Sequence, residues 1–450
     1  MVRTCQRGSV RKSIDINFII AIFLAIVTGA QARNPIGPPS TFPADPSAKV
    51  GADGQLYVYC SLDEKTDHYC SYSNVVLSTN DMKTWKFHPD SFVTLGKNDM
   101  LPANDTILYA PDCQYRDGLY YFYFCQPDQI PIGVATSECP TGPFSNPSFL
   151  NVGKHLEIDP ATFIDDDGQA YLVWGQFNLK MAKLNKDMRT LDEGSIQEPV
   201  ITEKEHHFHE GASMTKRNGL YYLIYADVSR AATPSCLGYA TSKSPFGPYQ
   251  YRGVIIDNSH CNPGNWNNHG SIVGFGGKWY VFYHRSSQGV VMMRRTCVEP
   301  ITFRDDGSIP EVEMTTQGAE PPLDSSLRIE AEQACGLWGN MRVSTVGEDT
   351  EILSGIRDGD RAVYKYLDFK TMPKHLRIRV KPGKSDSTIS FQSGDGSSSK
   401  IATLEIKGAP DVTWTEVVCE ASAVSGVHAV ELDFKVTGED GPLVDWWTFE

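Results

Sequence analysis

The chain has 450 residues and a formal net charge of −14 at pH 7. Partners that require a basic surface, such as nucleic acid or an anionic membrane, are therefore not expected. The length predicts more than one domain.

The first segment has the features of a secretory signal. A basic leader precedes ten apolar residues, 18–27, and the small-x-small motif of residues 30–32 follows them. Ten apolar residues are too few to cross a bilayer, which needs about 20. We expect residues 1–32 to be a cleaved signal peptide and the mature protein to be secreted, extracellular and free of the membrane. An uncleaved N-terminal anchor is the alternative.

Ten cysteines remain after this segment, at positions 60, 70, 113, 125, 139, 236, 261, 297, 335 and 419. An even number in a secreted chain favours disulfides over thiolate chemistry. A cysteine-based zinc site is not expected, because no C-x-x-C pair occurs. Cys335 and Cys419 lie alone in the last third and are expected to pair if that third is a separate domain.

Five two-residue turns recur at intervals of 50 to 64 residues, each followed by an aromatic and apolar run. They are Asp53-Gly54, Asp117-Gly118, Asp167-Gly168, Asn218-Gly219 and Gly276-Gly277. Such turns favour β-hairpins, and the runs are typical of half-buried strands. A unit of this size fits one propeller blade. We therefore predict an all-β chain with a five-bladed β-propeller over residues 33–316; a β-sandwich with similar hairpins is the alternative.

Three acidic residues occupy one position of this repeat. Asp45, Asp159 and Glu210 each lie nine residues before the glycine of their turn. The first strand of each blade is innermost, so these positions should converge on the central channel. Carboxylates brought together repel, which raises the pKa of at least one and gives a proton donor beside an acceptor. Glycoside hydrolysis uses such a pair, whereas a turn or solvated carboxylate is the alternative for any one residue.

The order and spacing of these motifs resemble glycoside hydrolase family 43. The match covers about 280 residues and includes ADPS, YAPDCQYRDGLYYFY, IDPATFIDDDGQAYLVWG, HEGASMTKRNGLYYLIYA and NHGSIVGFGGKWYVFYHR. The resemblance implies single-displacement hydrolysis with inversion. Asp45 would be the general base and Glu210 the general acid, while Asp159 would orient Glu210 and tune its pKa. Room for a water implies about 6.5–9.5 Å between the carboxyls of Asp45 and Glu210.

Four other propeller residues are candidates for the site. Asp112 lies just after the equivalent position of the second blade and is a candidate substrate contact. Trp266 and Arg285 are candidates for stacking on and hydrogen bonding to the sugar, with packing as the alternative for either. His269 matches a position where the family often has a histidine near the channel axis that ligates a calcium ion mostly through waters; a core histidine is equally compatible. The histidines around Glu210 lack zinc-site spacing.

The last third has a different pattern. Residues 317–326 are predicted to be a linker, and residues 327–450 a jelly-roll-like β-sandwich. The segments LRIEAEQ and GPLVDWWTFE at its two ends resemble carbohydrate-binding module family 6. Gly355, Asp411 and Leu443 stand where sugar-binding members have Tyr, Trp and Asn. We therefore expect little or no sugar binding at the usual cleft.

Three carboxylates of this module are candidates for a structural calcium site. The first and last strands should bring Glu330, Glu332 and Asp445 together, and carboxylate oxygens suit calcium. A solvated acidic strand end is the alternative. No organic cofactor is expected for the chain.

These features together predict a secreted inverting glycosidase that acts on a polysaccharide or oligosaccharide of plant-type pentoses. An α-L-arabinofuranosidase or arabinanase is the first choice, and a β-xylosidase the second. A non-catalytic propeller lectin and a purely structural protein are the alternatives from other classes, and the presence of all three acids disfavours both. The sequence leaves exo or endo action and the oligomeric state open.

Overall fold

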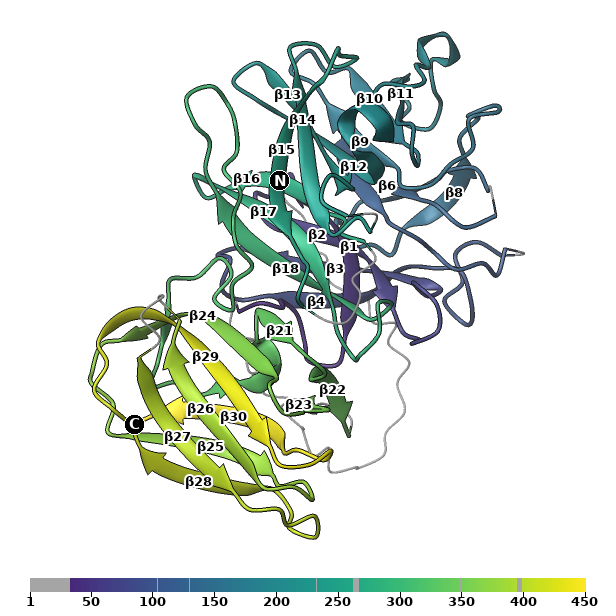
Figure 1. Cartoon of the computed structure of the whole chain (residues 1–450). Coiled ribbons are helices and arrows are strands. Elements are labelled where there is room, and N and C mark those ends of the chain that lie inside the picture. The colour runs from purple at the N-terminus through teal and green to yellow at the C-terminus, as the bar shows by residue number, and fades with distance from the viewer. Residues whose placement is uncertain are drawn as a thin grey trace, which may run out of the picture.

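The computed structural model describes residues 33–102, 104–128, 130–231, 233–261, 267–347, 350–394 and 399–450. Its elements are nearly all β-strands and form two parts, a propeller followed by a C-terminal module (Figure 1). The predicted signal peptide and Trp266 lie outside the described residues.

Five antiparallel sheets form the propeller, and the strands of each follow chain order. Blade one holds β1 (Phe42–Val50), β2 (Leu56–Asp63), β3 (Ser73–Thr79) and β4 (Lys86–Val93). Blade two holds β5 (Asp112–Arg116), β6 (Leu119–Phe124), β7 (Gly133–Ser137) and β8 (Ser145–Phe149). Blade three holds β9 (Ala161–Ile164), β10 (Ala170–Trp174) and β11 (Lys180–Leu184), followed by the short helices η1 (Glu193–Ser195) and α1 (Glu203–His206). Blade four holds β12 (Phe208–Arg217), β13 (Leu220–Asp227), β14 (Cys236–Ser242) and β15 (Gln250–Asp257), and blade five β16 (Ser271–Phe275), β17 (Lys278–Ser286) and β18 (Arg294–Ile301).

The predicted five-bladed propeller is confirmed. The five turn glycines, Gly54, Gly118, Gly168, Gly219 and Gly277, all adopt a positive φ between 78° and 92°, as the hairpin turns require. Blades three and five have three strands in their sheets rather than four. Apolar side chains fill the space between neighbouring blades, so the core is distributed around the ring.

The first described residues close the ring. The Ile36 N–H donates to the Thr296 carbonyl at 2.9 Å, and the Asn34 side chain accepts from the Val298 N–H at 2.9 Å. The N-terminal segment thus runs along β18 of the last blade before the chain enters β1 of the first. Hydrogen bonding therefore links the two ends of the propeller sequence.

The C-terminal module is a β-sandwich, as predicted. One sheet has the order β19-β24-β29-β26-β27 with β21 beside β24, and the other β22-β23-β30-β25-β28 with β20 beside β30. The strands of the first sheet are β19 (Leu323–Asp324), β21 (Gly336–Trp338), β24 (Arg361–Phe369), β26 (Ser387–Ser393), β27 (Lys400–Ile406) and β29 (Gly426–Val436). Those of the second are β20 (Ile329–Glu330), β22 (Arg342–Val346), β23 (Thr350–Ser354), β25 (His375–Lys381), β28 (Thr415–Glu420) and β30 (Leu443–Phe449), and the short helix η2 (Ala331–Gln333) follows β20. Apolar side chains of both sheets, Trp447 among them, share one core.

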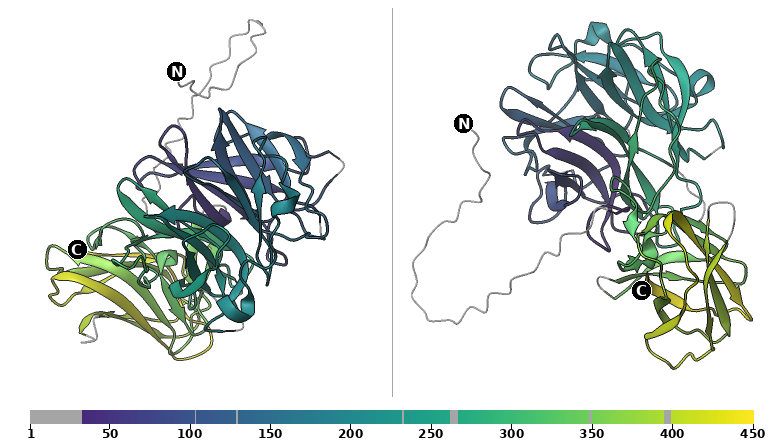
Figure 2. Two further views of the ribbon diagram at one scale, coloured as in Figure 1. Left: turned by 90° about the horizontal axis from the view of Figure 1, so that it is seen from above. Right: turned by 90° about the vertical axis from the view of Figure 1, so that its left-hand side faces the viewer.

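The module contacts the propeller directly and is not joined to it by a linker alone. The Thr316 N–H donates to the Lys365 carbonyl of β24 at 2.6 Å. Within the predicted linker, 317–326, β19 pairs with β24 and is already part of the sandwich. Arg295 of β18 forms a buried ion pair with Glu351 of β23. The two parts lie side by side in both views of Figure 2.

The predicted disulfide between Cys335 and Cys419 is wrong. Cys335 precedes β21 in one sheet, and its thiol donates to the Val363 carbonyl at 3.3 Å. Cys419 lies on β28 of the other sheet. Both are free thiols, as are Cys60, Cys70, Cys113, Cys125, Cys236 and Cys297 of the propeller.

Candidate active site

The three repeat-related acids lie at the start of the inner strands of blades one, three and four. Asp45 is in β1, Asp159 directly precedes β9, and Glu210 is in β12. They are 4%, 6% and 7% exposed, respectively. Asp159 senses the charges of both other acids and accepts a hydrogen bond from the Gly211 N–H. The fold therefore brings the three acids together at one mouth of the central channel.

The backbone has an unusual shape at these positions. Asp45 and Asp159 adopt φ values of 54° and 60°, and Gly211, directly after Glu210, adopts 65°. Positive φ is uncommon for residues other than glycine, although aspartate tolerates it better than most. The inner strand bends at the same place in these three blades. The bend interrupts the regular alternation of side chains along the strand. Each carboxyl therefore points toward its neighbours.

Asp45 is held as an ionised carboxylate. Its Oδ2 accepts from the Ser61 hydroxyl at 2.6 Å, and its Oδ1 accepts from Arg294 Nη1 at 2.7 Å. Burial alone would raise the pKa of Asp45, but Arg294, followed by His269, His284 and the hydrogen bond from Ser61, together outweigh burial and hold that pKa at about 2. Asp45 can therefore accept a proton from water at any pH near neutrality.

Arg294 is the main residue that the sequence did not reveal. It lies on β18 and is buried, and its Nε and Nη2 donate to the two carboxylate oxygens of Asp63 at 2.8 and 2.9 Å. The third nitrogen of the same guanidinium is left for Asp45. This fork fixes the base between blades one and five, because a guanidinium bonded to two carboxylates has little freedom.

His284 supports Asp45 from the backbone side. The Asp45 N–H donates to His284 Nδ1 at 3.2 Å, so this nitrogen is an acceptor. The proton is then on Nε2, which donates to the carbonyl and side-chain oxygens of Asn267 at 3.1 and 3.0 Å. Burial, aided by the charge of Arg294, lowers the pKa of His284 to about 3. The ring is neutral, and its 3.5 Å approach to the Asp45 carboxylate is not an ion pair.

The two oxygens of Glu210 have different surroundings. Oε2 accepts from the Gln176 side-chain amide at 2.7 Å, whereas the partner of Oε1 among the described residues is the Asn267 amide at 3.5 Å. An oxygen that accepts a strong hydrogen bond is a poor carrier for the acidic proton. Oε1 is therefore the oxygen suited to donate a proton to a leaving group. Gln176 lies in the loop after β10 and was not predicted from the sequence.

Asp159 differs from Asp45 in its protonation. Burial raises the pKa of Asp159 well above the usual range of aspartate, and the charges of Glu210 and Asp45 raise it further. Asp159 therefore retains a proton where an ordinary aspartate would be ionised. The cluster thus holds a proton on Asp159, beside the candidate acid Glu210, while Asp45 is ionised.

His269 completes the mouth of the channel. Its Nδ1 lies 3.6 Å from Asp45 Oδ1, and burial lowers the pKa of the imidazole. Among the described residues no group of three or more His, Cys, Asp and Glu side chains is arranged to hold a metal ion. Asp45, the nearest carboxylate, is occupied by Arg294 and Ser61. The side chains around His269 therefore do not form a direct calcium ligand set.

Gly211 leaves room for the His269 ring, and this predicts the effect of a substitution. A Cβ at residue 211 would lie 2.9 Å from three ring atoms of His269 and would also face the strain of positive φ. We expect Gly211→Ala to lower kcat/KM at least tenfold by displacing His269 from Asp45. Gly219→Ala is the matched control, because its φ is also positive but no atom lies within 4 Å. Comparable kcat/KM values for the two variants would refute this role of Gly211.

Asp112 does not face the site. Its carboxylate is fully buried and accepts from the Thr162 N–H at 2.6 Å and from the hydroxyls of Thr162 and Ser47. Lys49 Nζ lies 3.2 Å from the same carboxylate. All these partners are protein groups from blades one and three. Asp112 therefore joins blades, and the structure does not support the prediction that it contacts substrate.

Arg285 is also directed away from the acids. It is buried, and its Nη2 donates to the Tyr283 hydroxyl at 2.6 Å and to the Thr315 carbonyl at 2.7 Å. Successive residues of a strand point to opposite faces, so His284 faces Asp45 and Arg285 faces the other way. The structure does not support Arg285 as a sugar contact. Trp266, the other predicted contact, lies outside the described residues.

The predicted calcium ligands of the module do not form one site. Arg328 donates to Glu330 at 2.8 Å and lies 3.9 Å from Asp445, which also pairs with Arg379. Arginine side chains therefore supply the positive charge beside Glu330 and Asp445. Glu332 senses Glu330 and Glu351, and burial raises its pKa well above the usual range. The three carboxylates do not converge, and this donor arrangement does not fit a calcium ion.

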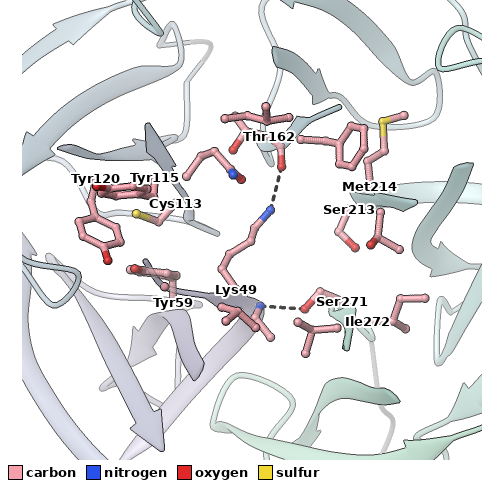
Figure 3. A pocket seen from close by; sticks show the side chains of 18 residues that line it. Lys49, Tyr59, Cys113, Tyr115, Tyr120, Thr162, Ser213, Met214, Ser271 and Ile272 are labelled. Carbon is pink, nitrogen blue, oxygen red and sulfur yellow. Dashed lines mark hydrogen bonds between the residues drawn. The ribbon is translucent and has the colours of Figure 1, made fainter. Parts of the chain in front are cut away.

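A cavity lies at the opposite mouth of the channel. It has a volume of about 260 Å³ and is lined by inner strands of all five blades (Figure 3). Its lining residues begin three positions after Asp45, Asp159 and Glu210, and Lys49 crosses it to reach the Thr162 carbonyl at 2.8 Å. The acids are not among them. The channel therefore has two distinct ends, and only one carries the catalytic cluster.

The fold and this cluster define a glycoside hydrolase. The family model for glycosyl hydrolases family 43 matches residues 32–309, and that for carbohydrate binding module family 6 matches residues 330–450. The chain belongs to glycosyl hydrolases family 43, and its C-terminal module is similar to the second family. Hydrolysis in this family needs no organic cofactor.

Individual relatives extend the comparison. A xylosidase/arabinosidase of Thermoclostridium stercorarium is 28% identical, over 86% of this chain and 92% of that protein. An arabinoxylan arabinofuranohydrolase of Paenibacillus polymyxa is 25% identical, over 90% of this chain and 72% of that protein. The solved structure of a β-xylosidase/α-arabinofuranosidase from a compost microbial metagenome, with xylotriose and in a calcium-free form, is 32% identical. The match covers 63% of this chain and 98% of the chain of that structure, with a TM-score of 0.53.

Proposed function

We propose that this glycoside hydrolase is an α-L-arabinofuranosidase that releases pentose units from plant-type polysaccharides or oligosaccharides with inversion. The observation that carries the proposal is the asymmetry of the cluster. The ion pair with Arg294 favours the ionised form of Asp45, while one oxygen of Glu210 accepts no strong hydrogen bond from the described residues. The names of the relatives, among them an arabinoxylan arabinofuranohydrolase, support a pentoside substrate.

The proposed reaction proceeds in one displacement. Asp45 accepts a proton from a water molecule, and the water oxygen bonds to the anomeric carbon. The bond from that carbon to the leaving oxygen breaks on the opposite face, and Glu210 Oε1 gives its proton to the leaving oxygen. Afterwards Asp45 is protonated and Glu210 is ionised, and exchange with solvent restores both. His284 and Arg294 keep Asp45 in place throughout.

The substrate assignment is tested with 4-nitrophenyl α-L-arabinofuranoside and 4-nitrophenyl β-D-xyloside. We expect a higher kcat/KM on the arabinofuranoside. A higher value on the xyloside would favour the second candidate, a β-xylosidase, which is also supported because one relative is named xylosidase/arabinosidase. No hydrolysis of either substrate by the wild-type chain would refute the proposed function.

Three further features belong to this proposal. The leader of residues 1–32 supports secretion, and an extracellular polymer is a substrate that a secreted enzyme can reach. The module's family supports a carbohydrate ligand, although the absence of the usual aromatic residues predicts weak binding at the usual cleft. A calcium ion held through waters near His269 stays a prediction, and no step of the reaction depends on it.

A further inference from the structure

Tyr69 carries a polar group that the fold leaves unused. It lies in the loop between β2 and β3, and its hydroxyl oxygen is buried. No hydrogen-bond partner for this hydroxyl occurs in the part of the chain that the structure describes. Buried hydroxyls almost always have a partner, because an unpaired one has lost its hydrogen bonds to water without replacement. A bound ligand can therefore supply the partner that the described residues do not.

The position of Tyr69 indicates where that group comes from. The Arg294 guanidinium lies over the Tyr69 ring, 4.7 Å from its centroid, and the same guanidinium binds Asp45. Burial raises the pKa of Tyr69 to about 12, and the charges of Asp63, Asp45 and Glu210 act in the same direction. The phenol thus keeps its proton and lies close enough to the catalytic acids to sense them. It is a hydrogen-bond donor at the edge of the active site.

The loop that carries Tyr69 is fixed by the same network. The Cys70 N–H donates to Asp63 Oδ1 at 2.8 Å, and Cys70 adopts a φ of 64°. Asp63 is itself held by two bonds from Arg294. Arg294 therefore positions both the base and the segment that presents the phenol. A donor fixed before substrate arrives loses little entropy on binding.

We propose that Tyr69 is a substrate-binding residue whose hydroxyl donates a hydrogen bond to a hydroxyl of the pentosyl ring held between Asp45 and Glu210. This rests on the proposed function, because it requires a sugar in that site. A sugar hydroxyl is a suitable partner: it accepts from the phenol and can donate its own proton to one of the nearby carboxylates. An anionic group would be repelled by the ionised carboxylate of Asp45.

The test pairs a protein variant with modified substrates. Tyr69→Phe should lower kcat/KM on the preferred 4-nitrophenyl pentoside roughly 5- to 50-fold, as expected for loss of one buried hydrogen bond. On the deoxy analogue that lacks the partner hydroxyl, the variant and the wild type should have equal kcat/KM. Comparison of the 2-deoxy and 3-deoxy analogues identifies that hydroxyl. The melting temperature of Tyr69→Phe should be unchanged or higher, because no described residue bonds to this oxygen.

Two outcomes would overturn the proposal while leaving the proposed function intact. One is a Tyr69→Phe variant with wild-type kcat/KM on the complete substrate. The other is an equal loss on the complete and on both deoxy substrates, since Tyr69 would then act through the protein. Tyr115→Phe, at the opposite mouth of the channel, is the matched control and should match the wild type. A wild-type chain inactive on all pentosides would instead count against the proposed function.

Discussion

Replacement of Glu210 by glutamine is expected to lower kcat/KM by about 10²- to 10⁴-fold on substrates with a sugar or alkyl leaving group. Such leaving groups need a proton as the bond breaks, and the amide has none to give. Glutamine can keep the hydrogen bond from Gln176, because its carbonyl accepts at the position of Oε2. The loss should therefore arise from chemistry rather than from disturbed structure.

The dependence on the leaving group distinguishes an acid from a binding residue. A 2,4-dinitrophenyl pentoside departs without protonation, so Glu210→Gln should hydrolyse it with kcat within about tenfold of the wild type. Initial rates on a series of aryl pentosides check this, and the variant should show a much steeper dependence on leaving-group pKa. An equal loss on every member of the series would contradict the assignment of Glu210 as the acid.

Removal of Arg294 should change the pH dependence of the reaction. In the wild type the pKa of Asp45 is about 2, so the base stays ionised above roughly pH 3. In Arg294→Met the strongest influence that opposes burial is lost, and the pKa of Asp45 rises. Protonation of the base then inactivates the enzyme at higher pH. We expect the acid limb of kcat/KM to move upward and the stability to fall by about 3–5 kcal/mol, because Asp45 and Asp63 lose a buried partner.

Arg295→Met is the matched control for that variant. Arg295 is the next residue, is buried to a similar degree, and pairs with Glu351 of the module instead of with Asp45. Its loss should lower stability without moving the acid limb. Both variants are compared by the pH profile of kcat/KM and by denaturant unfolding. An upward shift of the same size in both would show that the shift reflects weakened packing rather than the charge of Arg294.

The repeat made the fold and the three acids predictable from the sequence. Asp45, Asp159 and Glu210 share one offset from a turn glycine, and residues at equivalent positions of a propeller converge because the blades surround one axis. The turn glycines marked the hairpin between the first and second strands of each blade, since each turn needs a positive φ. The repeat therefore predicted which residues far apart in the sequence lie close together, and local secondary-structure propensity cannot predict this.

The supporting residues could not be found in this way. Arg294 and Gln176 lie outside the repeat position of the acids, and each acts through contacts made only in three dimensions. Asp112 lies near the repeat position, but its carboxylate accepts hydrogen bonds from residues of blades one and three. Arg285 is one residue from His284, and a shift of one position on a strand reverses the direction of the side chain. Whether such a residue takes part in the site depends on its burial and on its hydrogen-bond partners in the folded chain.

The module was predictable as a fold but not in its ion chemistry. The alternation of strands and turns predicted a sandwich, and two sheets are present. The carboxylates Glu330 and Asp445 suggested calcium, yet Arg328 and Arg379 supply the positive charge. Those arginines come from neighbouring segments, so only the folded arrangement reveals them. The predicted Cys335–Cys419 disulfide failed for the same reason, because in the folded chain both thiols are free and that of Cys335 donates to the Val363 carbonyl.

The anomeric configuration of the first product tests the central claim most directly. If Asp45 activates water while Glu210 protonates the leaving oxygen, the sugar is released with inverted configuration. Proton NMR during the first minutes of hydrolysis of 4-nitrophenyl α-L-arabinofuranoside should show β-L-arabinofuranose before mutarotation gives the equilibrium mixture. Initial accumulation of the α-anomer would mean that a carboxylate attacks the sugar itself, and would contradict the assignment of Asp45 as the base that activates water.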